Sequence, residues 1–387
     1  MKLIKPSFKI INQEDNLEGI YEAIENAGRT CYKSIGTRYF KIPLSGSNMP
    51  EVWHYVHENI ACYTKVEGDG VHSQILNGYV SIADKDVKNF EGLDKYECEF
   101  NPKYHKNITA KDFTERMVKS GHLAMLEFGT VYLKYDLSAV YKDDTEVYLG
   151  SYFADFYKNN KYSKITLNNT ILYVTTNYRV IIENCKLDDL AYLCEPTEFH
   201  EKRIFVRFIT DRGVSHELVR HRVFSFAQES TRYCNYSKDK FGNELTFIIP
   251  SWCTLEEGKY SWHGFNYLSD DYWCGWRKDS EPKNIEQISE LGKTIIERMA
   301  NYHWLLSNLK ESEKDYKNLL LKYTPQQARQ VLPNALKTEI NMCGFVSDWK
   351  HFFSLRSSHA GATGMHPDMD YIANKIYDEF LKRKYIN

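Results

Sequence analysis

The sequence predicts an α+β fold, because segments with helical periodicity and segments with strand periodicity both recur along its 387 residues. Residues 16–27 place apolar side chains three and four positions apart, as one side of a helix requires. Residues 130–135 alternate in polarity, as a half-buried strand does. Residues 324–327, Thr-Pro-Gln-Gln, combine a capping Thr with Pro at the first helical position.

Two helices are predicted in the first third of the chain. Asn16–Ala27 forms the first, and it runs into residues 28–32 (Gly-Arg-Thr-Cys-Tyr). Residues 35–107 are polar and show no clear period. Thr109–Lys119 forms the second helix, which we expect to stop at Gly121 because glycine favours helix ends.

Strands are predicted in the middle of the chain. Residues 130–135 form the first, and Asn169–Thr175 and Arg203–Ile209 form two more. A helix is then expected over Gly213–Arg222, with Ser215 as its cap.

Three further helices are predicted in the last third. The helix that Thr324 caps carries Arg329. Ser347 is expected to cap a helix over Asp348–Arg356, and an amphipathic helix follows over Asp368–Lys382.

The bulk composition is that of an ordinary globular protein, with 42% hydrophobic and 26% charged residues. The formal net charge of −2 gives no global basic field for nucleic acid or an anionic membrane, so any phosphate-binding surface must be local. No apolar run is long enough to span a bilayer, and the first residues lack the apolar core of a signal peptide.

The nine cysteines are odd in number and include no Cys-x-x-Cys pair or metal-type cluster with His. We therefore expect no disulfide framework, no bound metal and a cytoplasmic location. Walker-type and Gly-x-Gly-x-x-Gly phosphate loops, a His-Glu-x-x-His helix and Gly-x-Ser-x-Gly are also absent from the sequence.

The most informative segment is residues 220–233, which begins Arg-His-Arg and continues to Ser230 and Arg232. Guanidinium groups near hydroxyls suit a phosphate-bearing ligand, because Arg presents its donors in a rigid fork. On a helix Arg220 and Arg222 would point nearly opposite ways, toward two ligands or toward a ligand and a neighbouring subunit. The alternative is a solvated basic helix end, which Ser230 and Arg232 make less favourable.

Arg356 is a second unusual feature, because it ends an apolar stripe that contains Trp349 and Phe352. Such a charge must reach solvent, form a pair or point into a pocket. No Asp or Glu on that helix face is an obvious partner, so a partner would have to come from a tertiary contact. Taken singly, His122, Glu127, Arg329, His351 and Cys234 are each expected to be structural or surface residues.

Together these segments resemble the flavin-dependent thymidylate synthases (ThyX family) over most of the chain. The signature Arg-His-Arg, seven residues, Ser is matched by Arg220 to Ser230. Other matching segments are residues 28–32, 120–127, 211–219, 328–334 and 349–356.

The resemblance implies a ThyX-like α+β fold, with an antiparallel sheet flanked by helices and FAD sites formed where the subunits of a homotetramer meet. It implies reductive methylation of dUMP to dTMP, with methylenetetrahydrofolate as carbon donor, FAD as redox cofactor and NADPH as reductant. The partners implied are small molecules, without membrane or nucleic acid.

The resemblance also assigns site residues. The residues implied to hold dUMP are Glu217, Arg220, Gln228, Ser230, Arg232, Arg329 and Arg356. Arg356 is the implied catalytic residue, facing the uracil and favouring ionisation at N3. The residues implied to contact FAD are His122, Glu127, His221, Arg222 and His351. No protein nucleophile is implied, because the flavin carries the difficult chemistry.

This chain departs from the family in several places. We expect one domain over residues 1–387 with family-atypical insertions near 35–107, 136–167 and 237–282. Ala227 and Gln228 stand where many members have Asn and Glu, and Phe345 and Ser347 where members often have Asn and Arg near the flavin. After Arg356, either His359 or His366 takes the place of a family His or Gln.

Two other interpretations remain. The departures suggest a related flavin-dependent pyrimidine-nucleotide hydroxymethylase. A different class is a nucleic-acid-binding protein that uses Arg220, Arg222 and Arg232 on phosphates, against which the net charge and the lack of a basic stripe argue.

Overall fold

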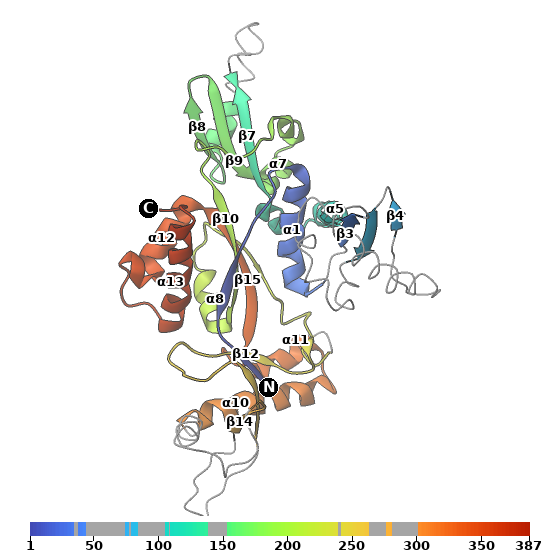
Figure 1. Ribbon diagram of the computed structural model, residues 1–387, viewed down its shortest axis with the longest axis vertical. Helices are drawn as coiled ribbons and strands as arrows, with labels where there is room; N and C mark the ends of the chain where they lie inside the picture. Colours follow the sequence, from blue (N-terminus) through green and yellow to red (C-terminus); the bar gives the residue numbers. More distant parts are fainter. Residues whose placement is uncertain are drawn as a thin grey trace, which may run out of the picture.

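The computed structural model describes residues 1–34, 38–43, 74–76, 79–83, 105–107, 109–137, 153–238, 241–262, 276–280 and 301–387. Within them a central four-stranded sheet lies between helices, with a smaller sheet toward each end of the long axis (Figure 1). The predicted α+β class, with an antiparallel sheet flanked by helices, is confirmed.

The central sheet has the strand order β11-β15-β10-β2 and is antiparallel throughout. Its longest pair joins β10 (Arg203–Asp211) to β15 (Lys337–Phe345), while β11 (Ser225–Gln228) and β2 (Ser7–Ile11) form the edges. Arg203 lies opposite Phe345, so the two long strands pair along their whole length. Because side chains alternate along a strand, the sheet has two separate faces to cover.

One face is covered by α1 (Leu17–Tyr32) and the 3-10 helix η5 (Leu123–Phe128). The side chains in contact there are Ala27, Phe128, Phe205, Ala227 and Cys343. Asn16 caps α1 by accepting a hydrogen bond from the Gly19 N–H at 2.7 Å, which confirms the predicted start of this helix.

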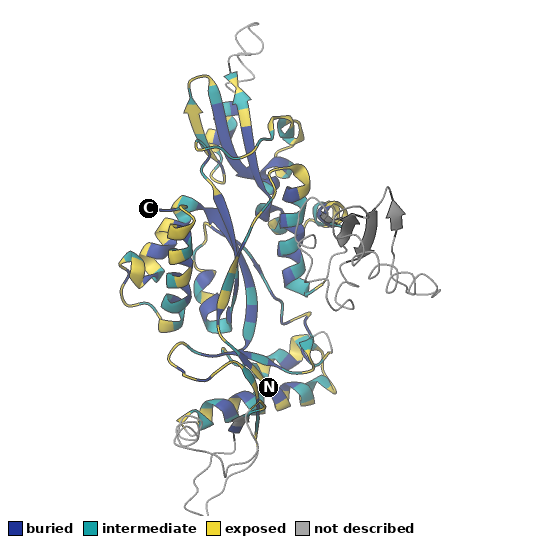
Figure 2. Cartoon of the chain, in the orientation of Figure 1, coloured by how far each residue is buried: buried dark blue, intermediate teal, exposed yellow. Residues whose placement is uncertain are grey.

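The opposite face is covered by α8 (Arg212–Leu218), α12 (Val346–Arg356) and α13 (Pro367–Lys382). Figure 2 shows buried residues running along the central strands and the inner sides of these helices. The core there includes Val206, Phe208, Leu218, Met342, Trp349, Phe352, Ile372 and Phe380. Each large apolar side chain buried in this way stabilises the fold by roughly 1.5–3 kcal/mol.

A three-stranded sheet, in the order β7-β9-β8, lies at one end of the molecule. It consists of β7 (Thr130–Asp136), β9 (Ile171–Asn177) and β8 (Lys164–Asn168). The strand predicted over residues 130–135 is confirmed. The strand predicted from Asn169 begins two residues later, because Asn169 has φ 54° in the turn that joins β8 to β9.

Several helices accompany this sheet. α5 (Ala110–Lys119) packs on α1 and confirms the second predicted helix, and Gly121 follows it with φ 72°. α7 (Tyr178–Glu183) and the 3-10 helix η7 (Leu187–Tyr192) follow β9.

The sheet at the other end has the order β12-β1-β13-β14. Its strands are β12 (Thr246–Ile248), β1 (Lys2–Ile4), β13 (Gly258–Trp262) and β14 (Trp276–Lys278), and β1 is parallel to β12. Helix α10 (His303–Leu320) and the short helices α11 (Pro325–Ala328) and η10 (Arg329–Val331) lie in the same region.

The helix predicted over Gly213–Arg222 was wrong at both ends. α8 begins one residue earlier, because the Asp211 carboxylate accepts a hydrogen bond from the Val214 N–H at 2.8 Å. Ser215 is buried inside α8 and is not its cap. The helix ends at Leu218, so the Arg-His-Arg triplet lies in the turn that follows, where the argument from opposite helix faces does not apply.

The Ser347 cap was also wrong. α12 begins at Val346, and the Asp348 carboxylate accepts a hydrogen bond from the Phe345 N–H at 3.0 Å. Ser347 lies in the first turn and donates its N–H to Glu201 Oε1. The Asp348 carboxylate therefore satisfies the N–H of Phe345, the residue that precedes the helix.

The other two late helices are confirmed. Gln327 Oε1 accepts the Thr324 N–H at 3.1 Å before α11, although Arg329 belongs to η10 rather than to this helix. α13 follows the predicted residues 368–382 and starts one residue earlier, at Pro367.

The predicted insertions, residues 35–107, 136–167 and 237–282, lie in large part outside the described residues. Residues 35–107 nevertheless contain a sheet in the order β4-β5-β3-β6, where the sequence showed no period. Its strands are β3 (Arg38–Pro43), β4 (Gln74–Leu76), β5 (Tyr79–Ala83) and β6 (His105–Asn107).

Candidate functional site

Arg356 has the tertiary partners that its own helix face does not supply. Its Nη1 donates to Glu217 Oε2 at 2.7 Å, and its Nε donates to His221 Nε2 at 3.1 Å. The apolar stripe predicted below it is confirmed, because Trp349 and Phe352 are fully buried. Arg356 is thus oriented by the end of α8 and the turn that follows, while its Nη2 has no partner among the described residues.

His221 is neutral in this arrangement. Burial lowers its pKa to about 4, and the neighbouring charges of Arg356 and His351 act in the same direction. Because Nε2 accepts from Arg356, the ring proton must reside on Nδ1. His221 therefore positions the guanidinium without adding a second positive charge.

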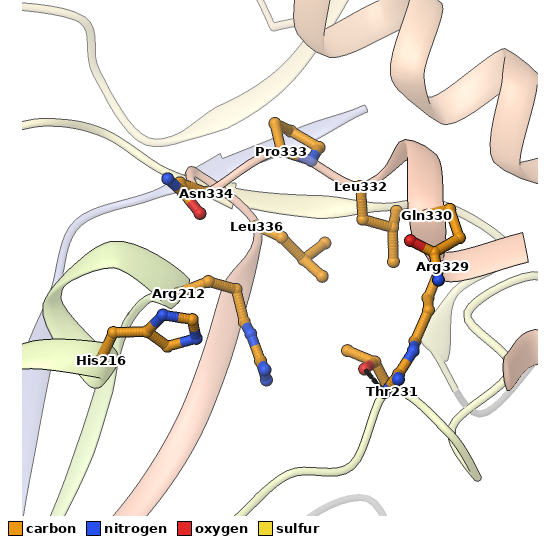
Figure 3. Close-up of a pocket in the computed structure, with 9 residues that line it drawn as sticks. All are labelled: Arg212, His216, Thr231, Arg329, Gln330, Leu332, Pro333, Asn334 and Leu336. Atoms are coloured by element: carbon orange, nitrogen blue, oxygen red, sulfur yellow. Dashed lines mark hydrogen bonds between the residues drawn. The ribbon is translucent and has the colours of Figure 1, made fainter. Parts of the chain in front are cut away.

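A cavity of about 370 Å³ opens at the other end of α8 (Figure 3). Arg212, the first residue of α8, and Arg329, from η10, extend into it from opposite sides, and Arg329 Nη1 donates to Thr231 Oγ1 at 3.4 Å. Its other lining residues are His216, Gln330, Leu332, Pro333, Asn334 and Leu336. Two guanidinium groups beside a hydroxyl form a donor set suited to a phosphate.

Arg212 was not predicted as a site residue. Burial lowers its pKa, and the nearby Glu229 carboxylate partly offsets that shift. Arg212 directly follows the capping Asp211 at the start of α8, and this local position alone does not indicate a ligand. Thr231 and His216 were also missed as site residues.

The predicted nucleotide residues fall into four environments. Glu217 and Arg356 form the ion pair, and Arg329 lines the cavity. Gln228 lies inside, where its Nε2 donates to Ser215 Oγ at 2.8 Å. The remaining three predicted residues lie along the signature segment, Arg220 and Arg232 exposed and Ser230 half-buried.

The five predicted FAD residues are divided between the two faces of the central sheet. His122 and Glu127 belong to the η5 region, on the α1 face, and Glu127 pairs with Arg179 at 2.7 Å. His221, Arg222 and His351 belong to the face that carries α8 and α12. The spacing of His351 suggested a core or an interface residue; it is exposed in one copy of the chain, so the core position is wrong and the interface position stays a prediction. One copy of the chain does not gather all five around one ligand.

Within the parts of the chain that the structure describes, no group of three His, Cys, Asp or Glu side chains is arranged to hold a metal ion. No described helix is both long and apolar enough to cross a membrane.

The fold and site define an α+β protein with an oriented arginine and a separate cationic cavity, and comparison with known proteins shows what the chain is similar to. Residues 197–383 match the family model described as thymidylate synthase complementing protein. Flavin-dependent thymidylate synthase from Mycobacterium tuberculosis is 29% identical over 149 residues, which cover 38% of this chain and 46% of that protein. The Corynebacterium glutamicum enzyme of the same name is 30% identical over 158 residues, covering 40% and 49%.

The chain therefore spans about half the length of these relatives, and the similarity to flavin-dependent thymidylate synthases lies mainly in residues 197–383. A solved structure of the UMP/dUMP methylase PolB from Streptomyces cacaoi, bound with 5-Br dUMP, matches with a TM-score of 0.29 and 18% identity. That match covers 46% of this chain and 67% of the methylase, and similarity of this extent carries no argument about activity.

Proposed function

We propose that this protein is a methyltransferase that converts dUMP to dTMP, with methylenetetrahydrofolate as carbon donor, FAD as redox cofactor and NADPH as reductant. The match of residues 197–383 to the thymidylate synthase complementing protein family and the similarity to flavin-dependent thymidylate synthases support this reaction. Residues 1–387 then act as one domain with insertions, in the cytoplasm.

The observation that carries the proposal is the orientation of Arg356. Its Nη1 donates to Glu217 and its Nε donates to His221. Its Nη2 has no partner among the described residues and can donate to a ligand. A preorganised cation stabilises negative charge that develops on a bound ring more effectively than mobile water does. In the proposed site Arg356 faces the uracil and favours the anionic form of its N3–C4 edge.

The cavity between Arg212 and Arg329 would receive the nucleotide phosphate. Both side chains are cationic and converge on the same space, and Thr231 adds a hydroxyl (Figure 3). Ser230 and Arg232 flank Thr231 in the chain and would complete the phosphate contacts. Gln228 would act indirectly, because its hydrogen bond to Ser215 fixes the signature segment to α8.

The residues present fit a flavin dinucleotide. Arg222 is exposed and offers a cation for its pyrophosphate, while exposed His122 and His351 offer polar flat rings. Bound FAD would supply the electron transfer that no side chain can provide. His122 and Glu127 lie on one face of the central sheet, and His221, Arg222 and His351 lie on the other. One FAD can therefore contact both groups only between two copies of the chain, which supports the expected homotetramer.

Flavin binding and its coupling to the nucleotide test the proposal. Protein mixed with FAD should retain yellow flavin absorbance after gel filtration, and should oxidise NADPH. Arg356→Ala should still bind FAD and fold but should not form dTMP. Wild-type turnover in this variant would contradict the role of Arg356, and failure to retain any flavin would contradict the cofactor.

A further inference from the structure

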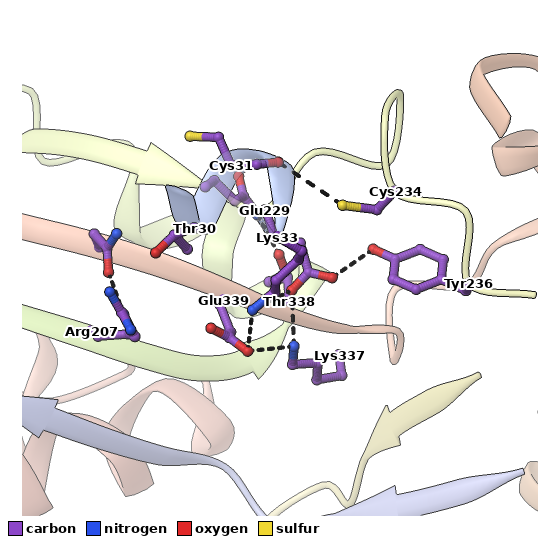
Figure 4. A network of polar contacts seen from close by, with 12 residues as sticks. Thr30, Cys31, Lys33, Arg207, Glu229, Cys234, Tyr236, Lys337, Thr338 and Glu339 are labelled. Atoms are coloured by element: carbon purple, nitrogen blue, oxygen red, sulfur yellow. Dashed lines mark hydrogen bonds and ion pairs between the residues drawn. The ribbon is translucent and has the colours of Figure 1, made fainter. Parts of the chain in front are cut away.

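A network of charged side chains joins the signature segment to two neighbouring elements, and the proposed chemistry does not use it. It consists of Lys33, Glu229, Lys337 and Glu339 (Figure 4). Glu229 lies within the signature segment, and its side chain is fully buried. Its Oε2 contacts Lys337 Nζ at 2.9 Å and Lys33 Nζ at 3.5 Å, while its Oε1 accepts from the Tyr236 hydroxyl at 2.9 Å.

Glu339 completes the network by pairing with the same two lysines. Its Oε1 contacts Lys337 Nζ at 2.7 Å and also pairs with Lys33. Burial alone would raise the pKa of Glu339, but Lys337 and Lys33 lower it to about 2. The formal charges of the two carboxylates and the two ammonium groups sum to zero.

Such a network is costly to bury and is weak evidence for stability, so its geometry matters more than its charge count. Three separate elements meet in it: the end of α1 through Lys33, the signature segment through Glu229, and β15 through Lys337 and Glu339. Lys33 follows the last residue of α1 and has the left-handed conformation, with φ 49°. From this position its side chain pairs with Glu229 and Glu339.

Ser230, which follows Glu229, also joins the signature segment to α1. The Ser230 N–H donates to the Cys31 carbonyl at 2.9 Å, and the Cys234 N–H donates to the Ser230 carbonyl at 2.9 Å. Thr231, which lines the cavity, lies inside this turn. Displacement of Glu229 would therefore displace the residues on which the phosphate is proposed to rest.

We propose that the charge network is a positioning device, which holds Ser230 and Thr231 against α1 in the arrangement that receives a nucleotide 5′-phosphate. This inference rests on the proposed function. Glu229 and its lysines touch no substrate, and they act through the backbone of the segment that Glu229 begins.

Two variants separate positioning from simple electrostatics. Lys33→Met keeps most of the aliphatic stem and removes one tether, leaving the network with a charge of −1. Glu229→Gln keeps the shape and leaves it at +1. If only charge mattered, Glu229→Gln would tighten binding of a phosphate dianion and Lys33→Met would weaken it. Positioning predicts that both weaken it.

The experiment is calorimetric titration of the FAD-loaded protein with dUMP and, separately, with deoxyuridine. For Lys33→Met and Glu229→Gln, we expect the dUMP Kd to rise by about tenfold, the size expected for one lost charged hydrogen bond. The deoxyuridine Kd should change less than about twofold by the same reasoning, because that ligand has no phosphate. A general loss of structure would weaken both ligands together.

The controls use the same chemistry elsewhere. Lys33→Arg keeps the positive charge and should bind dUMP as the wild type does. Lys314→Met removes an exposed lysine paired with exposed Glu311, and it should leave both Kd values unchanged. Circular dichroism verifies folding, and if Glu229→Gln does not fold, the partly exposed Lys33 still carries the test. Unchanged dUMP binding in Lys33→Met, or tighter binding in Glu229→Gln, would overturn the inference. Absence of dUMP binding to the wild type would instead overturn the proposed function, and the inference with it.

Discussion

Arg356 and Glu217 form an ion pair with an Nη1–Oε2 distance of 2.7 Å, which joins the last turn of α12 to the last turn of α8. The two residues are 139 positions apart in the chain. Both are partly exposed, so we expect the pair to contribute little to stability and to serve mainly to orient the guanidinium.

Glu217→Gln should therefore impair catalysis more than folding. We expect kcat to fall by about tenfold, in line with the loss of one charge-assisted hydrogen bond, while the thermal midpoint stays within a few degrees. Glu183→Gln, which breaks the exposed pair with Arg179, is the matched control and should leave turnover unchanged. Equal kcat for Glu217→Gln and wild type would show that Arg356 needs no such partner.

Acid should destabilise the protein through His221. An unfolded histidine titrates near pH 6.5, whereas folded His221 titrates at about 4, so the unfolded chain binds more protons between these values. Stability therefore falls as the pH is lowered from 7 toward 4, by at most about 2 kcal/mol after allowance for partial exposure. Unfolding of the FAD-free protein by urea at pH 7 and 5 should show a smaller loss for His221→Gln than for wild type. An identical pH dependence would contradict the neutral, buried histidine.

The two cavity arginines should both contribute to phosphate binding. Arg212→Ala and Arg329→Ala should each raise the Kd for dUMP by about 10- to 100-fold, as expected for a lost charged hydrogen bond, with little effect on deoxyuridine. Arg116→Ala, on the surface helix α5, serves as a control for the loss of one positive charge. If dUMP binds equally well to all three variants, the phosphate lies elsewhere.

The Asp211 cap should be measurable as stability. Asp211→Ala removes the hydrogen bond to the Val214 N–H and should cost about 1 kcal/mol, within the usual range for helix caps. Asp188→Ala, on the exposed helix η7, is the control, and urea denaturation compares the two. Equal stability of both variants would indicate that α8 starts without help from the Asp211 side chain.

The sequence predicted most of the elements around the site, because their local signals agree with their tertiary setting. Asn16, Thr324 and the apolar stripe of α12 each act as the pattern indicates. The predicted end of α8 was wrong because Val219 to Arg222 continue a helix-compatible pattern. Its predicted start was wrong because only Asp211 indicates that the helix begins earlier.

The sequence predicted which residues belong to the site but not how these residues are arranged in space. The sequence could not show that Glu217 and His221 hold Arg356, because such pairing depends on how α8 and α12 cross the sheet. Arg212 was missed for a similar reason, since its place opposite Arg329 arises only in the folded chain. Local patterns identify chemistry-bearing residues, and long-range packing decides which of them meet.

The most direct test of the central claim is the mass of the nucleotide product after incubation of the protein with FAD, NADPH, methylenetetrahydrofolate and dUMP. The account predicts a product heavier than dUMP by one methylene, as dTMP is, and no such product when NADPH is omitted. A mass increase that also includes one oxygen would indicate a hydroxymethylase. Unchanged dUMP, with FAD demonstrably bound, would contradict thymidylate synthesis.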